Sequence, residues 1–313
     1  MLVACCLVLA VAATGLKAWG ASQAAADSFD DGYYAQMSVT APVRVTGGLD
    51  PATGDIAFAD AQVQNNGAHM DVVADSAAFR AADGVSGAWT AKLGGKAALL
   101  PLDGSAAGLG AEIGRRASAE FSLDTTFSGV AAGKMVDKSL GSLTLTFSEK
   151  KEAFAVFSAD DGSLTFYKRG TKPAAGRVYN GKAATEVYTG FEDKTYGCVG
   201  YDEGDHIDGW PPDGAQWYRG IIDTPWFGVK DQIKTVTVAD DGIRPKATNA
   251  WFYRMINLEE ADLGKLDASE ATSAHMMFCL CVNLRALEAP RFSDSLRNLK
   301  DLASYCWKLD TLD

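Results

Sequence analysis

Histidine is scarce in this chain, and its three copies (His69, His206 and His275) lie far apart. They leave little material for histidine-based catalysis or for a metal centre, so neither an enzyme nor a bound cofactor is expected. Basic residues are also in the minority, with 29 Lys and Arg against 40 Asp and Glu, for a net charge of -11. Because phosphate binding needs clustered Lys and Arg, nucleic acid is not expected as a partner.

The main apolar run, residues 2–13 (LVACCLVLAVAA), is shorter than the roughly 20 residues that span a bilayer. Its length is that of a signal-peptide core, and small residues follow it. Residues 1–26 are therefore predicted to be a signal peptide or an N-terminal anchor. No basic residue precedes the run, so an upstream start, an uncleaved anchor and an ordinary buried helix stay open as alternatives. We expect a secreted or cell-surface protein that meets the membrane only through this segment.

The next region, residues 27–150, alternates apolar and polar residues over short runs that are separated by turn signals. Such runs, without a long helix between them, predict a β-sandwich. The Gly-containing stretch 104–116 is expected to be irregular. The strand-like runs are 37–45, 55–64, 69–74, 88–92, 119–127 and 140–147.

A second β-rich region is predicted over residues 151–245. It opens with the runs 153–157 and 163–167, which flank Asp161-Gly162. Asp-Gly between two strand-like runs indicates a hairpin, because Gly adopts the positive φ that the turn requires. The run 233–238 predicts a further strand. This region is expected to flank and cap the segment that follows it.

From residue 246 onward the sequence repeats. Phe252 corresponds to Phe278 at an offset of 26 residues, and Phe278 to Ala303 at an offset of 25. These offsets lie in the range of leucine-rich repeats, whose units stack a strand and a short helix into a solenoid. The apolar positions expected to be structural are Phe252, Leu258, Leu266, Phe278, Cys281, Leu284, Leu287, Cys306 and Leu309.

The unit at 266–287 (LDASEATSAHMMFCLCVNLRAL) resembles the BspA-type leucine-rich repeat, which reads approximately L-D-T-S-x-V-T-x-M-x-x-M-F-x-x-C-x-x-L-x-x-L. It departs from that pattern at Ala268, Ala271 and Ala274. Residues 151–245 look like the flank that precedes such repeats, and Trp251-Phe252 open the first repeat. The resemblance implies a Gram-positive-like bacterial surface or secreted protein, adhesin-like and without catalysis.

The expected fold is therefore mainly β: an N-terminal β-sandwich, a β-rich cap, and a short C-terminal leucine-rich solenoid of α/β repeats over residues 246–313. Because the chain stops within a unit, at residues 309–313, the solenoid is expected to be truncated. Its strand face is expected to bind an extracellular protein or glycan through Glu259, Glu260, Arg285 and Glu288. The alternative is a structural spacer or a self-assembling surface component.

The acidic loop at residues 202–208 is the remaining candidate for a metal site or a catalytic site. Asp202, Glu203, Asp205 and Asp208 could supply oxygen ligands to Ca²⁺, although their spacing is not that of an EF-hand. The same loop is the place for a second alternative, a carbohydrate-active enzyme, because carboxylate pairs cleave glycosidic bonds. Cys281 and Cys306 occupy equivalent repeat positions and are expected to be buried structural thiols.

Overall fold

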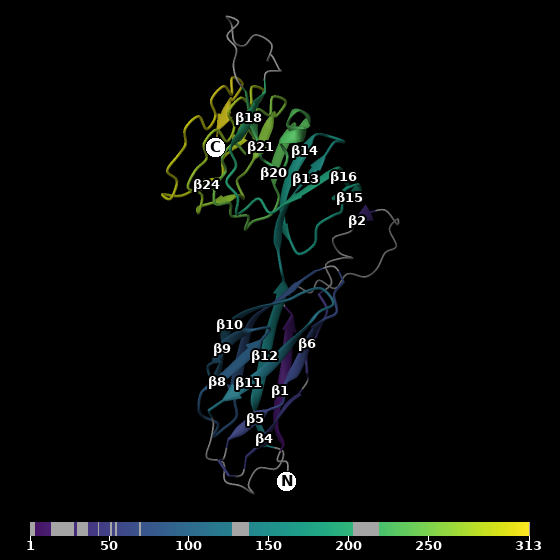
Figure 1. Ribbon diagram of the computed structural model, residues 1–313, viewed down its shortest axis with the longest axis vertical. Coiled ribbons are helices and arrows are strands. Elements are labelled where there is room, and N and C mark those ends of the chain that lie inside the picture. The colour runs from purple at the N-terminus through teal and green to yellow at the C-terminus, as the bar shows by residue number, and fades with distance from the viewer. Residues whose placement is uncertain are drawn as a thin grey trace, which may run out of the picture. The chain divides into compact units, whose positions relative to one another are not determined.

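The computed structural model describes residues 4–13, 28–29, 37–42, 44–50, 52–53, 55–68, 70–126, 138–202 and 219–312 (Figure 1). The chain divides into two compact units. Unit 1 is formed by Met1–Gln23 and Asp31–Lys150, and unit 2 by Ala24–Asp30 and Lys151–Asp313. Strands dominate both, and the single helix among the described residues is the short 3-10 helix η1 (Phe227–Gln232). The protein is therefore mainly β.

The described residues of unit 1 form two sheets. The six-stranded sheet has the order β10-β7-β12-β1-β4-β5, and the five-stranded sheet has the order β3-β6-β11-β8-β9. The strands of the first sheet are β1 (Ala4–Ala13), β4 (Arg44–Leu49), β5 (Ile56–Phe58), β7 (Val72–Ala81), β10 (Asp103–Ile113) and β12 (Lys138–Glu149). Those of the second are β3 (Val39–Thr40), β6 (Ala61–Asn65), β8 (Trp89–Leu93), β9 (Lys96–Leu100) and β11 (Ser118–Thr125).

Alternating side chains join these two sheets through one core. In β8, Trp89, Ala91 and Leu93 are buried while the residues between them reach the surface. Phe79 of β7 lies in the opposite sheet, and its ring centroid is 4.7 Å from that of Trp89. Both residues belong to a single cluster of buried side chains. Each sheet thus buries one face against the other, as the period of two in the sequence requires.

The stretch 104–116, expected to be irregular, instead lies largely within strand β10, so that expectation was wrong. Leu109, Ala111 and Ile113 are buried in alternation. A register shift against β7 falls between Gly108 and Ala111, where Gly110 has a φ of 63°. The glycines therefore accommodate an irregularity inside the strand and do not end it.

The apolar segment Ala4–Ala13 forms strand β1 in the middle of the six-stranded sheet. It runs parallel to β12 and antiparallel to β4. A uniformly apolar run has no period that separates strand from helix, so its sequence alone left several alternatives open. Residues 14–26 lie outside the described residues, and the assignment of 1–26 as a leader or anchor stays a prediction.

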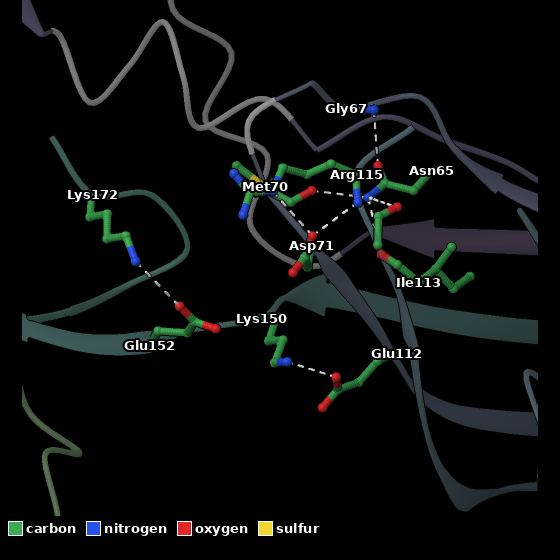
Figure 2. A network of polar contacts seen from close by, with 11 residues as sticks. Asn65, Gly67, Met70, Asp71, Glu112, Ile113, Arg115, Lys150, Glu152 and Lys172 are labelled. Carbon is green, nitrogen blue, oxygen red and sulfur yellow. Dashed lines mark hydrogen bonds and ion pairs between the residues drawn. The ribbon is translucent and has the colours of Figure 1, made fainter. Parts of the chain in front are cut away.

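A buried asparagine holds one end of unit 1 together (Figure 2). The side-chain amide of Asn65 donates to the carbonyls of Met70, Ile113 and Gly114 at 2.9–3.2 Å. Its Oδ1 accepts the N–H of Gly67 at 2.9 Å. One side chain thereby fixes the loop after β6 to the end of β10.

Unit 2 is built on a seven-stranded sheet of order β17-β13-β14-β20-β21-β23-β25. Strands β13 and β14 pair as an antiparallel hairpin around Asp161-Gly162, where Gly162 has a φ of 73°, so the predicted hairpin is confirmed. The strands of this sheet are β13 (Glu152–Ser158), β14 (Ser163–Arg169), β17 (Glu186–Thr189), β20 (Thr235–Val238), β21 (Glu260–Asp262), β23 (Ala286–Glu288) and β25 (Thr311–Leu312).

Unit 2 has three smaller sheets in the part that the structure describes. The first has the order β16-β15-β2, and the other two pair β18 with β19 and β22 with β24. Their bounds are β2 (Ser28–Phe29), β15 (Arg177–Tyr179), β16 (Lys182–Ala184), β18 (Cys198–Asp202), β19 (Arg219–Ile222), β22 (Asp267–Ala268) and β24 (Arg291–Phe292).

The repeated segment stacks with one unit per parallel strand. Strands β20, β21, β23 and β25 are all parallel and in register. Away from the sheet, the N–H groups of alternate residues donate to carbonyls one unit further on, as from Phe252 to Met277 and from Phe278 to Leu302. Positive φ recurs at equivalent positions, such as Arg254 and Leu280.

The expectation of α/β repeats was wrong in one respect, because residues 246–312 contain no α-helix. The segments opposite the strands run as successive turns, with i to i+3 bonds such as Tyr253 N–H to the Ala250 carbonyl. A residue with positive φ in each such segment interrupts helical geometry, and alternate N–H groups are used between units.

Aromatic side chains fill the interior of the stack where β14 meets the first repeat. Phe166, Trp226 and Trp251 pack with ring centroids 5.2–5.6 Å apart, and Phe252 stacks on Phe278 at 5.2 Å. Cys306 and Leu309 in the last described unit are half-buried. The other seven predicted structural positions are fully buried.

Candidate functional site

A row of charged residues precedes the parallel strands of unit 2. The N–H of Glu259 donates to the Lys234 carbonyl at 2.8 Å, that of Arg285 to the Glu259 carbonyl at 2.8 Å, and that of Asp310 to the Arg285 carbonyl at 2.9 Å. All four residues are exposed. We call these four residues, Lys234, Glu259, Arg285 and Asp310, the charge row. Neighbouring positions in such a stack lie about 4.8 Å apart, and the sign of the charge alternates from one position to the next.

A second exposed set lies on the strands themselves. In β21, Glu260 and Asp262 are exposed on either side of the buried Ala261. In β23, Glu288 is exposed next to the buried Leu287. Glu260, Asp262 and Glu288 therefore share the outer side of the sheet, which we call the acidic face. The structure thus brings together all four ligand-binding residues predicted from the sequence.

Sequence reasoning missed Lys234, Asp262 and Asp310. A signal for two of them was present, because Lys234 lies 25 residues before Glu259 and Asp310 lies 25 residues after Arg285. Those distances equal one repeat. Extending the repeat beyond its apolar positions would have found them. Asp262 follows from the alternation of β21 once that strand is assigned.

The acidic face places like charges in direct register. Asp262 pairs with Glu288 in the parallel ladder between β21 and β23. Like charges at paired positions repel each other and destabilise a sheet by a few tenths of a kcal/mol or more. A Cβ on Gly264 would lie 1.9 Å from Oε1 of Glu288, so a larger residue there would require the flexible Glu288 side chain to move. The N–H of Gly264 donates to Oδ1 of Asp262 at 3.3 Å.

The acidic loop predicted to bind calcium falls mostly outside the described residues. The backbone of Asp202 lies in β18, opposite Arg219 of β19. Its side chain, and the whole of Glu203, Asp205 and Asp208, are not described. In the part of the chain that is described, no group of three or more His, Cys, Asp or Glu is arranged to hold a metal ion. The calcium site and the glycosidase alternative stay predictions.

The thiols of the repeats donate along the stack. Sγ of Cys281 contacts the Phe252 carbonyl at 3.0 Å, and Sγ of Cys306 contacts the Phe278 carbonyl at 3.1 Å. Burial raises the pKa of the Cys281 thiol well above its ordinary value, and it raises the pKa of Cys279 to about 12. Such thiols stay protonated at neutral pH and are poor nucleophiles. They fit a structural role.

Comparison of the chain with protein-family models, with curated proteins and with solved structures found no match. Among the residues for which the structure gives positions, no helix has the length and apolar character needed to cross a membrane.

Proposed function

We propose that this protein is an extracellular binding protein of the adhesin type and that it presents the charge row and the acidic face of unit 2 to a partner. The observation that carries the proposal is the register of Asp262 with Glu288 on exposed strands. A like-charged pair weakens the sheet, and such a local cost is expected where a surface serves binding.

The finer fold assignment belongs to the same proposal. Unit 2 is proposed to contain BspA-type leucine-rich repeats, supported by the 26- and 25-residue offsets and by positive φ at Arg254, Leu280 and Tyr305. Unit 1 is proposed to be a β-sandwich module, supported by two sheets that share one core.

The charges indicate the kind of partner. The charge row alternates in sign, so it offers a partner no excess of either charge. The acidic face is not balanced in this way. It suits a protein partner with exposed Lys or Arg, because complementary potentials raise the association rate and fix orientation. A neutral glycan would have to bind by hydrogen bonding alone.

The test is binding of the full chain to immobilised extracellular-matrix proteins and glycans, with and without calcium. The variant pair is Asp262→Asn with Glu288→Gln, which removes both charges and keeps the shape. We expect the dissociation constant to rise about tenfold, and the wild-type affinity to fall with added salt. A matched control, Lys92→Ala with Asp124→Ala, removes an exposed ion pair from unit 1 and should bind like the wild type.

Two outcomes contradict the proposal. Absence of saturable binding by the folded chain would favour the structural-spacer alternative. Binding that the Asp262 and Glu288 variant retains in full would move the site away from the acidic face. Loss of binding on chelation of calcium would instead support a role for the acidic loop at 202–208.

A further inference from the structure

Strand β1 occupies a central position in the six-stranded sheet of unit 1. Nine of its residues, Cys5 to Ala13, pair with β12, with a register shift between Cys6 and Leu7, and five, Ala4 to Val8, pair in register with β4. In the described order of this sheet, β1 is the strand that joins the β4-β5 pair to the other strands. Figure 1 shows it as a purple arrow beside β12.

The neighbours of β1 would form a strand-shaped slot without it. Strand β12 would lose its parallel partner and β4 its antiparallel partner, so both would expose rows of unpaired N–H and C=O groups. Such rows template the addition of another strand. Main-chain hydrogen bonds then supply affinity that depends little on the identity of the side chains.

The connection of β1 to the rest of the chain is long. Residues 14–27 separate it from β2, and β2 pairs with β15 in unit 2. No tight hairpin ties β1 to β12 or to β4, since β4 begins only at Arg44. A connection of 14 residues gives an effective concentration on the order of 1 mM, which a second copy can rival when the protein is locally concentrated.

The sequence of β1 does not fix which strand enters the slot. Every residue from Leu2 to Ala13 is apolar, so the run has no alternating pattern that would favour the strand of its own copy over that of another. Exposing a run that is apolar at every position to water is unfavourable in free energy once the run leaves its own sheet. Capture by an equivalent slot is therefore its favourable alternative.

We propose that the slot between β12 and β4 accepts the 4–13 strand of a second copy of this chain, so that unit 1 links copies by strand exchange. Reciprocal exchange gives a closed dimer, and exchange in one direction gives a linear assembly. The inference applies to the chain that keeps residues 4–13, as in the alternatives to a cleaved signal peptide, and does not depend on what the acidic face of unit 2 binds.

A natural cysteine makes strand exchange measurable. Cys6 lies opposite Thr46 in the antiparallel pair of β1 and β4. Opposite residues in such a pair have Cβ atoms about 4.5–5.5 Å apart, which a small movement brings within reach of a disulfide. The experiment uses a donor chain, whose 4–13 strand is followed, and an acceptor chain, whose slot is tested. The donor carries Cys5→Ser and Cys198→Ser and keeps Cys6. The acceptor chain carries Cys5→Ser, Cys6→Ser, Cys198→Ser and Thr46→Cys.

The two chains, purified with residues 1–14 retained, are mixed and oxidised with glutathione disulfide. Oxidation joins the two thiols as the reagent is reduced to two thiols. Because donor and acceptor each lack the partner thiol of this pair, a link between position 6 and position 46 forms only between copies. We expect a covalent dimer whose yield rises with protein concentration and whose link mass spectrometry places at these two positions.

Two further chains separate the outcomes. One has Cys6 and Thr46→Cys together and reports pairing within a copy. The other is an acceptor with Arg44→Cys in place of Thr46→Cys, a position opposite Val8. Equal cross-linking of Cys6 to both acceptors would mean random collision and would overturn the proposal. A link within the first chain, with none between donor and acceptor, would overturn exchange between copies, and no link in any chain would overturn the pairing of β1 itself.

Discussion

Removal of the Asn65 side chain should destabilise unit 1 far more than removal of its neighbour. Asn65 is completely buried and serves three carbonyls and one N–H. The Gly114 carbonyl still accepts the N–H of Ala117, so Asn65→Ala leaves up to three of these groups without a partner, at about 1–3 kcal/mol each before relaxation. We expect a net loss of about 3–5 kcal/mol, a large part of the stability of a domain of this size.

Asn66 provides the matched control. It is exposed, and its amide donates to Oγ1 of Thr40 at 2.8 Å. Asn66→Ala should cost about 0.5 kcal/mol. The measurement is urea unfolding followed by hydrogen exchange of peptides from residues 61–126, which reports on unit 1 separately from unit 2. Equal losses for the two variants would refute the reasoning, because burial and the number of orphaned groups are all that distinguish them.

The remaining predictions concern unit 2. Leu284→Ala should lower the free energy of unfolding by about 2–5 kcal/mol, because Leu284 is fully buried. Leu309→Ala, at the equivalent but half-buried position, should lower it by about 1 kcal/mol. Urea titrations that ranked the two variants in the opposite order would contradict the stacking. The pKa of Asp267 is held below its ordinary 3.8, chiefly by hydrogen bonding from Ser269. Its stabilisation is therefore present above pH 3.8 and is lost as the pH falls through the lowered pKa. Asp267→Asn should flatten the acid side of the stability profile, and an unchanged profile in thermal melts at pH 2–5 would contradict that assignment.

Local rules predicted several elements correctly. The hairpin of β13 and β14 follows from Asp161-Gly162, because a turn with positive φ between two strand-like runs has few other solutions. The repeat offsets were visible in the apolar positions, and the structure stacks them strand on strand, as with Ala261 against Leu287. The alternation in unit 1 indicated two-faced strands such as β8.

Other features depended on contacts that no local pattern encodes. Gly108 and Gly110 suggested a loop, yet pairing with β7 makes the segment a strand with an irregular register. The run at 4–13 has no period, so its assignment to β1 rests on its pairing with β12 and β4. The turns opposite the repeat strands replaced the expected helices, because hydrogen bonds to the next unit take the N–H groups that a helix would use.

For the candidate site, too, some features follow from the sequence and others depend on the tertiary structure. By itself the sequence determined which residues are charged and that Glu259 and Arg285 are one repeat apart. Only the tertiary structure decided that Asp262 lies in register with Glu288 and that Lys234, outside the predicted repeats, begins the charge row. The physical reason is that strand pairing joins residues 25 or 26 positions apart, and one pair alone does not identify the face that water reaches.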